Sequence, residues 1–212
     1  MLEDTDLETK TTVIAPEELK KQAEICGEIR AHWAAAGRTP RAFVDTYGCQ
    51  QNEADSEKLR GMLAACGYEM AETEEGADVI VLNTCAIREH AEQRVYGNVG
   101  ALVHTKRRHP GQKIFLCGCM MGQDHVVQKI RESYRHVDGV FNPHQLWRFP
   151  ALLKYVLSTN KRIFAAEDSA GSIAEGIPLL RQGGVKAWVS IMYGCNNFCS
   201  YCIVPYVRGR ER

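Results

Sequence analysis

The chain has 212 residues, enough for one domain or for one domain with part of a second. Hydrophobic residues make up 45% and charged residues 25%, as in soluble globular proteins, and 26 basic residues balance 26 acidic ones. The zero net charge excludes a basic surface over the whole chain, so any contact with nucleic acid must be local.

Residues 1–12 are acidic and polar, which predicts a disordered tail. They lack the basic start and apolar run of a signal peptide, and no stretch approaches the roughly 18–20 apolar residues of a membrane span. We therefore expect a cytoplasmic protein without membrane contact. In a reducing cytoplasm, nine cysteines favour metal ligation or thiol chemistry over a disulfide framework.

A helix is predicted to begin near Pro16 and to end at Gly37, and an alternation of strands and helices follows. AFVDTYGC predicts a strand that ends at Cys49, and the apolar runs DVIVLNTC and KIFLCGC predict buried parallel strands that end at Cys85 and Cys119. Helices are expected within EADSEKLRGMLAACG and over residues 88–108, 123–135 and 145–158, with short strands in YEMAE and VDGVFN.

The alternation predicts an α/β fold, with an open, mainly parallel sheet between flanking helices. We assign residues 1–38 to a tail and helix, and residues 39–158 to the sheet domain. Residues 159–185 are rich in glycine and predict a linker with at most a short extended piece. KAWVSIMYG predicts the first strand of a second domain, over residues 186–212.

Cys49, Cys85 and Cys119, called here the first cysteine set, each directly follow a predicted strand and precede a helix. The carboxyl ends of parallel strands share one edge of a sheet, where such folds bind ligands. Three thiols could therefore meet there, provided that their strands are near neighbours. From the residues alone, a shared metal site and three inert buried thiols both remain open.

Cys195, Cys199 and Cys202, called the second cysteine set, follow the spacing C-x-x-x-C-x-x-C. Thiolates favour zinc and iron–sulfur clusters. Common zinc sites use four ligands, and no fourth cysteine or histidine follows here, so three ligands on a four-iron cluster fit better.

Three other cysteines have plainer interpretations. Cys66 lies on the apolar stripe of a predicted helix and is expected in the core. Cys26, in the N-terminal helix, is expected to be incidental. Cys117 is a candidate spare ligand, but alternation along its strand favours the core.

The string GCNNFCSYCIVPYVRGRER resembles the radical S-adenosylmethionine enzymes, and within them the methylthiotransferases of the tRNA-modifying MiaB type. TYGCQQNEADSE, NTCAIREHAE and GCMMGQ resemble the three cysteine motifs of that family's N-terminal domain. The resemblance covers about residues 40–212, and four motifs in the right order make it specific. Gly122 and Cys117 depart slightly from the family pattern, and neither is a ligand position.

The resemblance implies two [4Fe-4S] clusters, one on each cysteine set, with S-adenosylmethionine bound to the second and Tyr201 near its adenine or simply packed in the loop. One electron would split S-adenosylmethionine into methionine and a 5′-deoxyadenosyl radical. A second S-adenosylmethionine would supply a methyl group. The product would be a methylthio group on ring carbon 2 of N(6)-isopentenyladenosine in tRNA, beside the anticodon.

The implied partners are tRNA and an electron donor such as flavodoxin or ferredoxin, and we expect a monomer. The basic stretch over residues 104–109, with Arg208 and Arg210, could contact RNA phosphate or remain solvated. The chain resembles only the first strand and cluster loop of a radical S-adenosylmethionine barrel. We therefore expect a truncated barrel and no turnover by the isolated chain.

Two alternatives stay open at this point. The first is a methylthiotransferase for threonylcarbamoyl-adenosine in tRNA or for a ribosomal protein aspartate. The second is a metal-binding scaffold without catalytic activity. This scaffold would bind an iron–sulfur cluster or zinc. Metal analysis discriminates, because stoichiometric zinc with no iron would exclude both methylthiotransferase hypotheses.

Overall fold

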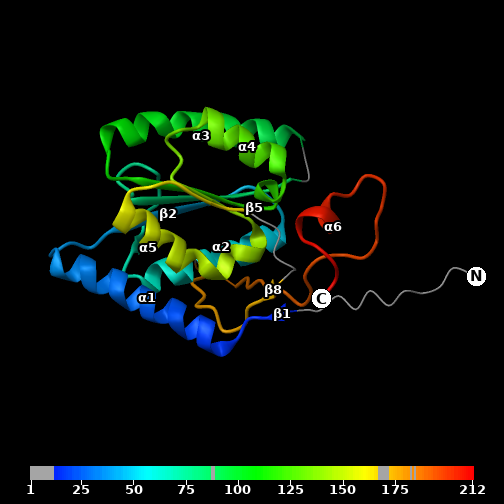
Figure 1. Cartoon of the computed structure of the whole chain (residues 1–212), viewed down its shortest axis with the longest axis horizontal. Helices are drawn as coiled ribbons and strands as arrows, with labels where there is room; N and C mark the ends of the chain where they lie inside the picture. The colour runs from blue at the N-terminus through cyan, green and yellow to red at the C-terminus, as the bar shows by residue number, and fades with distance from the viewer. Residues whose placement is uncertain (1–11, 87–88, 167–171, 182, 184) are drawn as a thin grey trace, which may run out of the picture.

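The protein is built around a six-stranded, entirely parallel sheet with the strand order β3-β2-β4-β5-β6-β7 (Figure 1). The computed structural model describes residues 12–86, 89–166, 172–181, 183 and 185–212. The strands are β2 (Arg41–Thr46), β3 (Glu69–Met70), β4 (Val79–Thr84), β5 (Lys113–Gly118), β6 (Gly139–Phe141) and β7 (Ile163–Ala165). This arrangement confirms the predicted open parallel sheet.

Helices cover both faces of the sheet (Figure 1). One face carries α1 (Pro16–Ala35), α2 (Gln50–Ala65) and α5 (Phe149–Thr159), and the other carries α3 (Glu89–Arg108) and α4 (Asp124–Ser133). Two 3₁₀ helices, η1 (Cys119–Gly122) and η2 (Pro143–Arg148), connect strands to helices. The layered order follows from strand–helix alternation, because each crossover places its helix on one face of the sheet.

The two central strands are apolar on both faces because helices cover both faces. Every residue of β4 and β5 is buried, as the continuous apolar runs predicted. On the side of α5, Phe115 meets Phe149 edge to face, with ring centroids 5.4 Å apart. Leu59 and Leu63 of α2 are fully buried, which confirms the apolar stripe predicted for that helix.

The segment expected to be a linker contributes two strands. β7 completes the edge of the main sheet by pairing with β6, and β8 (Ser172–Ile173) pairs with β1 (Thr12–Val13) in a separate two-stranded ribbon. Both strands are short, so their sequence carries little periodicity. The tail predicted over residues 1–12 lies outside the described residues, except for Thr12 in β1.

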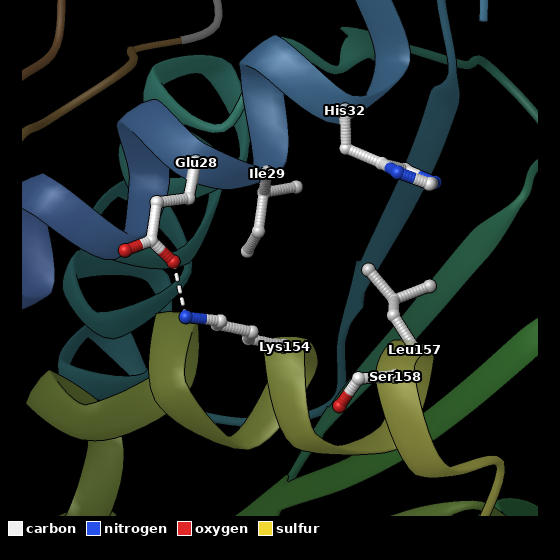
Figure 2. Close-up of a pocket in the computed structure, with 6 residues that line it drawn as sticks. All are labelled: Glu28, Ile29, His32, Lys154, Leu157 and Ser158. Atoms are coloured by element: carbon white, nitrogen blue, oxygen red, sulfur yellow. Dashed lines mark hydrogen bonds and ion pairs between the residues drawn. The ribbon is translucent and has the colours of Figure 1, made fainter.

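Helix α1 packs against α5 across a small pocket of about 200 Å³ (Figure 2). Glu28 and Lys154 form an ion pair at one end, and Ile29 and Leu157 provide apolar walls (Figure 2). Among the described helices, none is both long and apolar enough to cross a membrane.

Cys26 is not incidental, because it lies in the core where α1 crosses α2. Its thiol donates to the Met62 carbonyl at 3.9 Å, and the neighbouring Cys26 thiol together with burial raises the pKa of the Cys66 thiol. Cys66 itself is buried, as predicted. The contact depends on how two helices pack, which neither helix reveals by itself.

The strand predicted over residues 186–194 is absent from the described part of the chain. Val189 and Ile191 are exposed, Ile191 to 94%, because none of the described strands pairs with this segment. The chain instead folds back on itself: Tyr193 and Arg212 exchange two backbone hydrogen bonds of 2.9 Å. A short helix, α6 (Val204–Val207), lies within this turn.

Candidate metal centre at the carboxyl edge of the sheet

The first cysteine set lies at the ends of three adjacent strands, β2, β4 and β5. The register pairs Thr84 with Gly118, so Cys85 and Cys119 leave the sheet side by side. Cys49 caps the N-terminus of α2, three residues after β2 ends. The adjacency that the sequence could only assume is therefore present in the structure.

The side chain of Asn52, in the first turn of α2, joins two of these thiols. Its Oδ1 accepts from the Cys49 thiol at 3.4 Å and lies 3.9 Å from Sγ of Cys119. The two sulfur atoms are thus no farther apart than the sum of these distances. Sequence reasoning missed Asn52, although its place three residues after a helix-capping cysteine would point it back toward that cysteine.

A buried amide network fixes the orientation of Asn52. Its Nδ2 donates to Asn83 Oδ1 at 3.0 Å and to the Thr84 carbonyl at 2.9 Å, while Asn83 Nδ2 donates to the Asn52 carbonyl at 2.8 Å. The amide nitrogen of Asn52 faces β4 and that of Asn83 faces α2, so the side-chain oxygen of Asn52 faces the cysteines. The network ties the start of α2 to the end of β4.

Two glycines allow the close approach of the strand ends. A Cβ on Gly48 would lie 2.8 Å from Cβ of Cys85, which places that cysteine against the backbone next to Cys49. Gly118 has φ +94, and a Cβ there would lie 2.2 Å from the Thr84 carbonyl oxygen. Any side chain at Gly118 would therefore push apart the chain segments that carry Cys85 and Cys119.

The thiols differ in exposure and charge. Cys49 is exposed, whereas Cys85 and Cys119 are buried, at 5% and 4% exposure. Burial raises the pKa of Cys119 to about 11, and the nearby Arg208 opposes this shift. Cys117 is fully buried within β5, as the alternation predicted, and burial raises its pKa well above the ordinary value.

Arg208 enters this group from the far end of the chain. Its Nε donates to Sγ of Cys119 at 2.9 Å, and its Nη1 donates to Asp55 Oδ2 at 2.6 Å. The expectation that Arg208 meets RNA phosphate or solvent is wrong, because the residue is only 6% exposed. Burial beside a carboxylate holds the guanidinium inside the protein, away from any surface ligand.

The second cysteine set lies on the loop before α6, with Cys199 exposed and the other two partly buried. The amide of Cys195 donates to the Gly209 carbonyl at 3.1 Å, and the amide of Cys202 donates to the Cys199 carbonyl at 3.0 Å. Tyr201 is 91% exposed, so it does not serve as a packing residue of the loop. Its contact with a cofactor stays a prediction.

Two cations of the basic stretch at the end of α3 bind partners within the protein. Lys106 forms an ion pair with Asp138 and donates to the His136 carbonyl at 2.8 Å, and Arg108 pairs with Glu75 at 2.7 Å. Both cations lie near the C-terminus of a helix, where positive charge is favourable. This stretch therefore has a structural role in the described protein.

The donors at the sheet edge suit a thiolate-ligated group several atoms wide. Within the described residues, no three His, Cys, Asp or Glu side chains are arranged to hold a single metal ion. The first cysteine set nevertheless brings three soft sulfur donors to one edge, with a buried guanidinium that complements negative charge. These residues fit an anionic iron–sulfur cluster in donor chemistry.

Comparison with known proteins gives a consistent result. Residues 41–142 match the uncharacterized protein family UPF0004. The chain is 48% identical over 200 residues to the tRNA-2-methylthio-N(6)-dimethylallyladenosine synthase of Alkaliphilus oremlandii, covering 94% of this chain and 42% of that protein.

Proteins of the same name from two other organisms match this chain with similar identity and coverage. The Clostridioides difficile protein is 46% identical over 96% of this chain and 43% of its own length, and the Clostridium tetani protein is 51% identical over 80% and 38%. The chain thus spans about two fifths of the length of the curated relatives it matches.

Proposed function

We propose that the chain belongs to the methylthiotransferases and carries the two cysteine sets of a radical S-adenosylmethionine enzyme acting on tRNA. The reaction adds a methylthio group to ring carbon 2 of N(6)-isopentenyladenosine, beside the anticodon. The observation that supports this proposal is the meeting of Cys49, Cys85 and Cys119 at one sheet edge. Its partners would be tRNA and a one-electron donor.

The two sets have separate roles in this proposal. The first set would hold one [4Fe-4S] cluster, and the second would hold another together with S-adenosylmethionine. When bound, these groups supply the one-electron chemistry, sulfur and methyl group that no side chain can provide. Three cysteines per cluster leave one iron of each without a protein ligand.

The residues of this chain prepare the first site in three ways. Asn52 orients two thiols, and burial of Cys85 and Cys119 keeps water away from them. Burial raises the pKa of Cys119 to about 11, so its metal-free thiol is protonated at neutral pH; a bound metal would take the place of this proton. Arg208 then offsets the negative charge left on sulfur.

Metal loading provides the first test. After anaerobic reconstitution with iron and sulfide, we expect about eight irons and about eight sulfides per chain. Replacing the second cysteine set with alanine should remove about half, and Cys49→Ala in that background should remove the rest. Cys117→Ala is the matched control and should keep its iron. Stoichiometric zinc with no iron in every preparation would contradict the proposal.

Activity is tested in a chimera, because the relatives are longer than this chain. The chain replaces the matching part of the Alkaliphilus oremlandii protein in a strain that lacks methylthiolated tRNA. Mass spectrometry of digested tRNA should then find 2-methylthio-N(6)-isopentenyladenosine, and Cys49→Ala should abolish it. A methylthio group on threonylcarbamoyl-adenosine instead would show that the substrate is wrong.

A further inference from the structure

Arg208 connects two segments that are far apart in the sequence. It follows α6, six residues after Cys202, yet its guanidinium lies among residues of α2 and the end of β5. All three of its nitrogens face polar partners, since Nη2 also lies 3.4 Å from Asn52 Oδ1. In Figure 1, α6 lies beside the edge of the sheet rather than over a helical face.

The surroundings of Arg208 carry more positive than negative charge. Asp55 is its buried carboxylate partner, but Lys58 also approaches Asp55, at 3.8 Å. A buried charge is tolerated only when it is paired and hydrogen-bonded. One carboxylate between two cations leaves positive charge beside Sγ of Cys119, where it complements an anionic thiolate group.

The backbone around Arg208 also positions the second cysteine set. Gly209, the next residue, accepts the amide hydrogen of Cys195. On the other side, Val207 is buried against Gly122 of η1, where a Cβ on the glycine would meet Val207 Cβ at 3.2 Å. Fixing Arg208 therefore fixes both the turn that begins the second set and the segment that follows Cys119.

We propose that Arg208 is a positioning residue that holds the second cysteine set against the first and places a positive charge beside the group that the first set binds. The anchoring depends only on contacts within the chain. The charge effect rests on the proposed function, because it requires a cluster on the first set. The two parts are therefore tested separately.

Hydrogen exchange of the metal-free, full 212-residue chain tests the anchoring. Arg208→Met should speed exchange of the Cys195 and Arg212 amides by about tenfold, as expected when hydrogen bonds to a charged group are lost. Arg210→Met is the control, since Arg210 is exposed and lies over the Phe198 ring, and it should change these amides little. Equal exchange in the two variants would overturn the anchoring.

In Arg208→Met the buried Asp55 loses its closer cation and keeps only Lys58 at 3.8 Å, which is expected to destabilise the local structure. The double variant Asp55→Asn with Arg208→Met removes the buried charge that would be left behind. Faster exchange at Cys195 and Arg212 in this variant too, with the sheet amides still protected, supports the anchoring. Exchange at the unsubstituted rate in the double variant contradicts it.

The reduction potential of the first cluster tests the charge. Protein with the second cysteine set replaced by alanine is reconstituted, so that only one cluster is present. Arg208→Met should shift the potential to a more negative value, while Arg208→Lys should restore it because the charge is kept. An unchanged potential in Arg208→Met overturns the charge effect. Failure to bind any iron overturns the proposed function instead, and the exchange result still decides the anchoring.

Discussion

Residues 39–166 carry the first cysteine set and residues 185–212 carry the second, but the two regions hold these cysteines differently. In the first region, strands packed between helices place the cysteines at their ends, and two of the three thiols are buried. In the second, none of the three is buried, and apolar side chains such as Val185, Val189 and Ile191 are exposed. The sheet determines one set through packing, whereas backbone pairing and Arg208 determine the other.

The difference shows that the two regions differ in rigidity because they differ in buried apolar area. Buried apolar area stabilises the sheet region, so its cysteine geometry is fixed before any ligand binds. The second region has few buried apolar contacts, which is typical of segments that open locally at low free-energy cost. Three experiments test this contrast, from the largest expected effect to the smallest.

Removal of a core side chain should show the difference in stability between the two regions most clearly. Phe115→Ala removes a fully buried ring that packs against Phe149, and should cost about 3–5 kcal/mol of unfolding free energy. Ile191→Ala, at an exposed position, should change it by less than about 0.5 kcal/mol. Urea unfolding followed by circular dichroism measures both. Comparable losses would show that the second region is packed as tightly as the sheet.

A methyl group at the sheet edge should disturb the first cysteine set itself. Gly118→Ala adds a Cβ against the Thr84 carbonyl at a positive φ, and should cost about 2–4 kcal/mol. Gly97→Ala is the matched control: this glycine lies within α3 with open space around it, so the change should stabilise by roughly 0.5–1 kcal/mol.

Iron binding extends that comparison. In protein that lacks the second cysteine set, Gly118→Ala should lower the iron content and Gly97→Ala should leave it unchanged. A Gly118→Ala protein that is stable and fully loaded would mean that the strand ends tolerate displacement, contrary to a fixed edge.

The smallest expected effect concerns pH. Burial lowers the pKa of His136, although its hydrogen bond to the Val99 carbonyl opposes this. A lowered pKa means that the folded protein favours the neutral ring. The contribution of His136 to the free energy of unfolding is therefore fully present above the ordinary pKa of about 6.5. It is lost as the pH drops below that value. The side chain is only partly buried, so screening by solvent keeps the loss well under about 1 kcal/mol.

The measurement compares His136→Gln with the unsubstituted protein at pH 7.5 and pH 5. Thermal unfolding should show a smaller pH dependence in the variant. An identical dependence would assign the acid sensitivity of the sheet region to other groups.

Sequence reasoning succeeded where local pattern and packing coincide. The apolar runs at β4 and β5 are buried on both faces, and this alone predicts central strands. The equivalence of Cys49, Cys85 and Cys119 was visible because each directly follows a predicted strand. Their proximity needed the order β2-β4-β5, which depends on tertiary structure.

The missed features depend on contacts between distant segments. Arginine is usually exposed, and nothing near Arg208 in the chain indicates that Asp55 and Cys119 surround it. The apolar residues 186–194 predicted a strand, but a strand forms only beside a partner. The helical spacing of Asn52 from Cys49 is a signal that can be seen in the local sequence. The hydrogen bonds from Asn52 to β4 leave no such signal there.

The order β2-β4-β5 has a further consequence, because the distance between neighbouring strands of a sheet is nearly constant. Neighbouring strands lie about 4.8 Å apart, so the outer two strands that carry the first cysteine set are separated by about twice that spacing. A single zinc ion draws its sulfur ligands to within about 4.6 Å of one another. Because the strands themselves lie farther apart than the sulfur ligands of one zinc ion, we expect this edge to favour a wider thiolate-bound group over a single zinc ion.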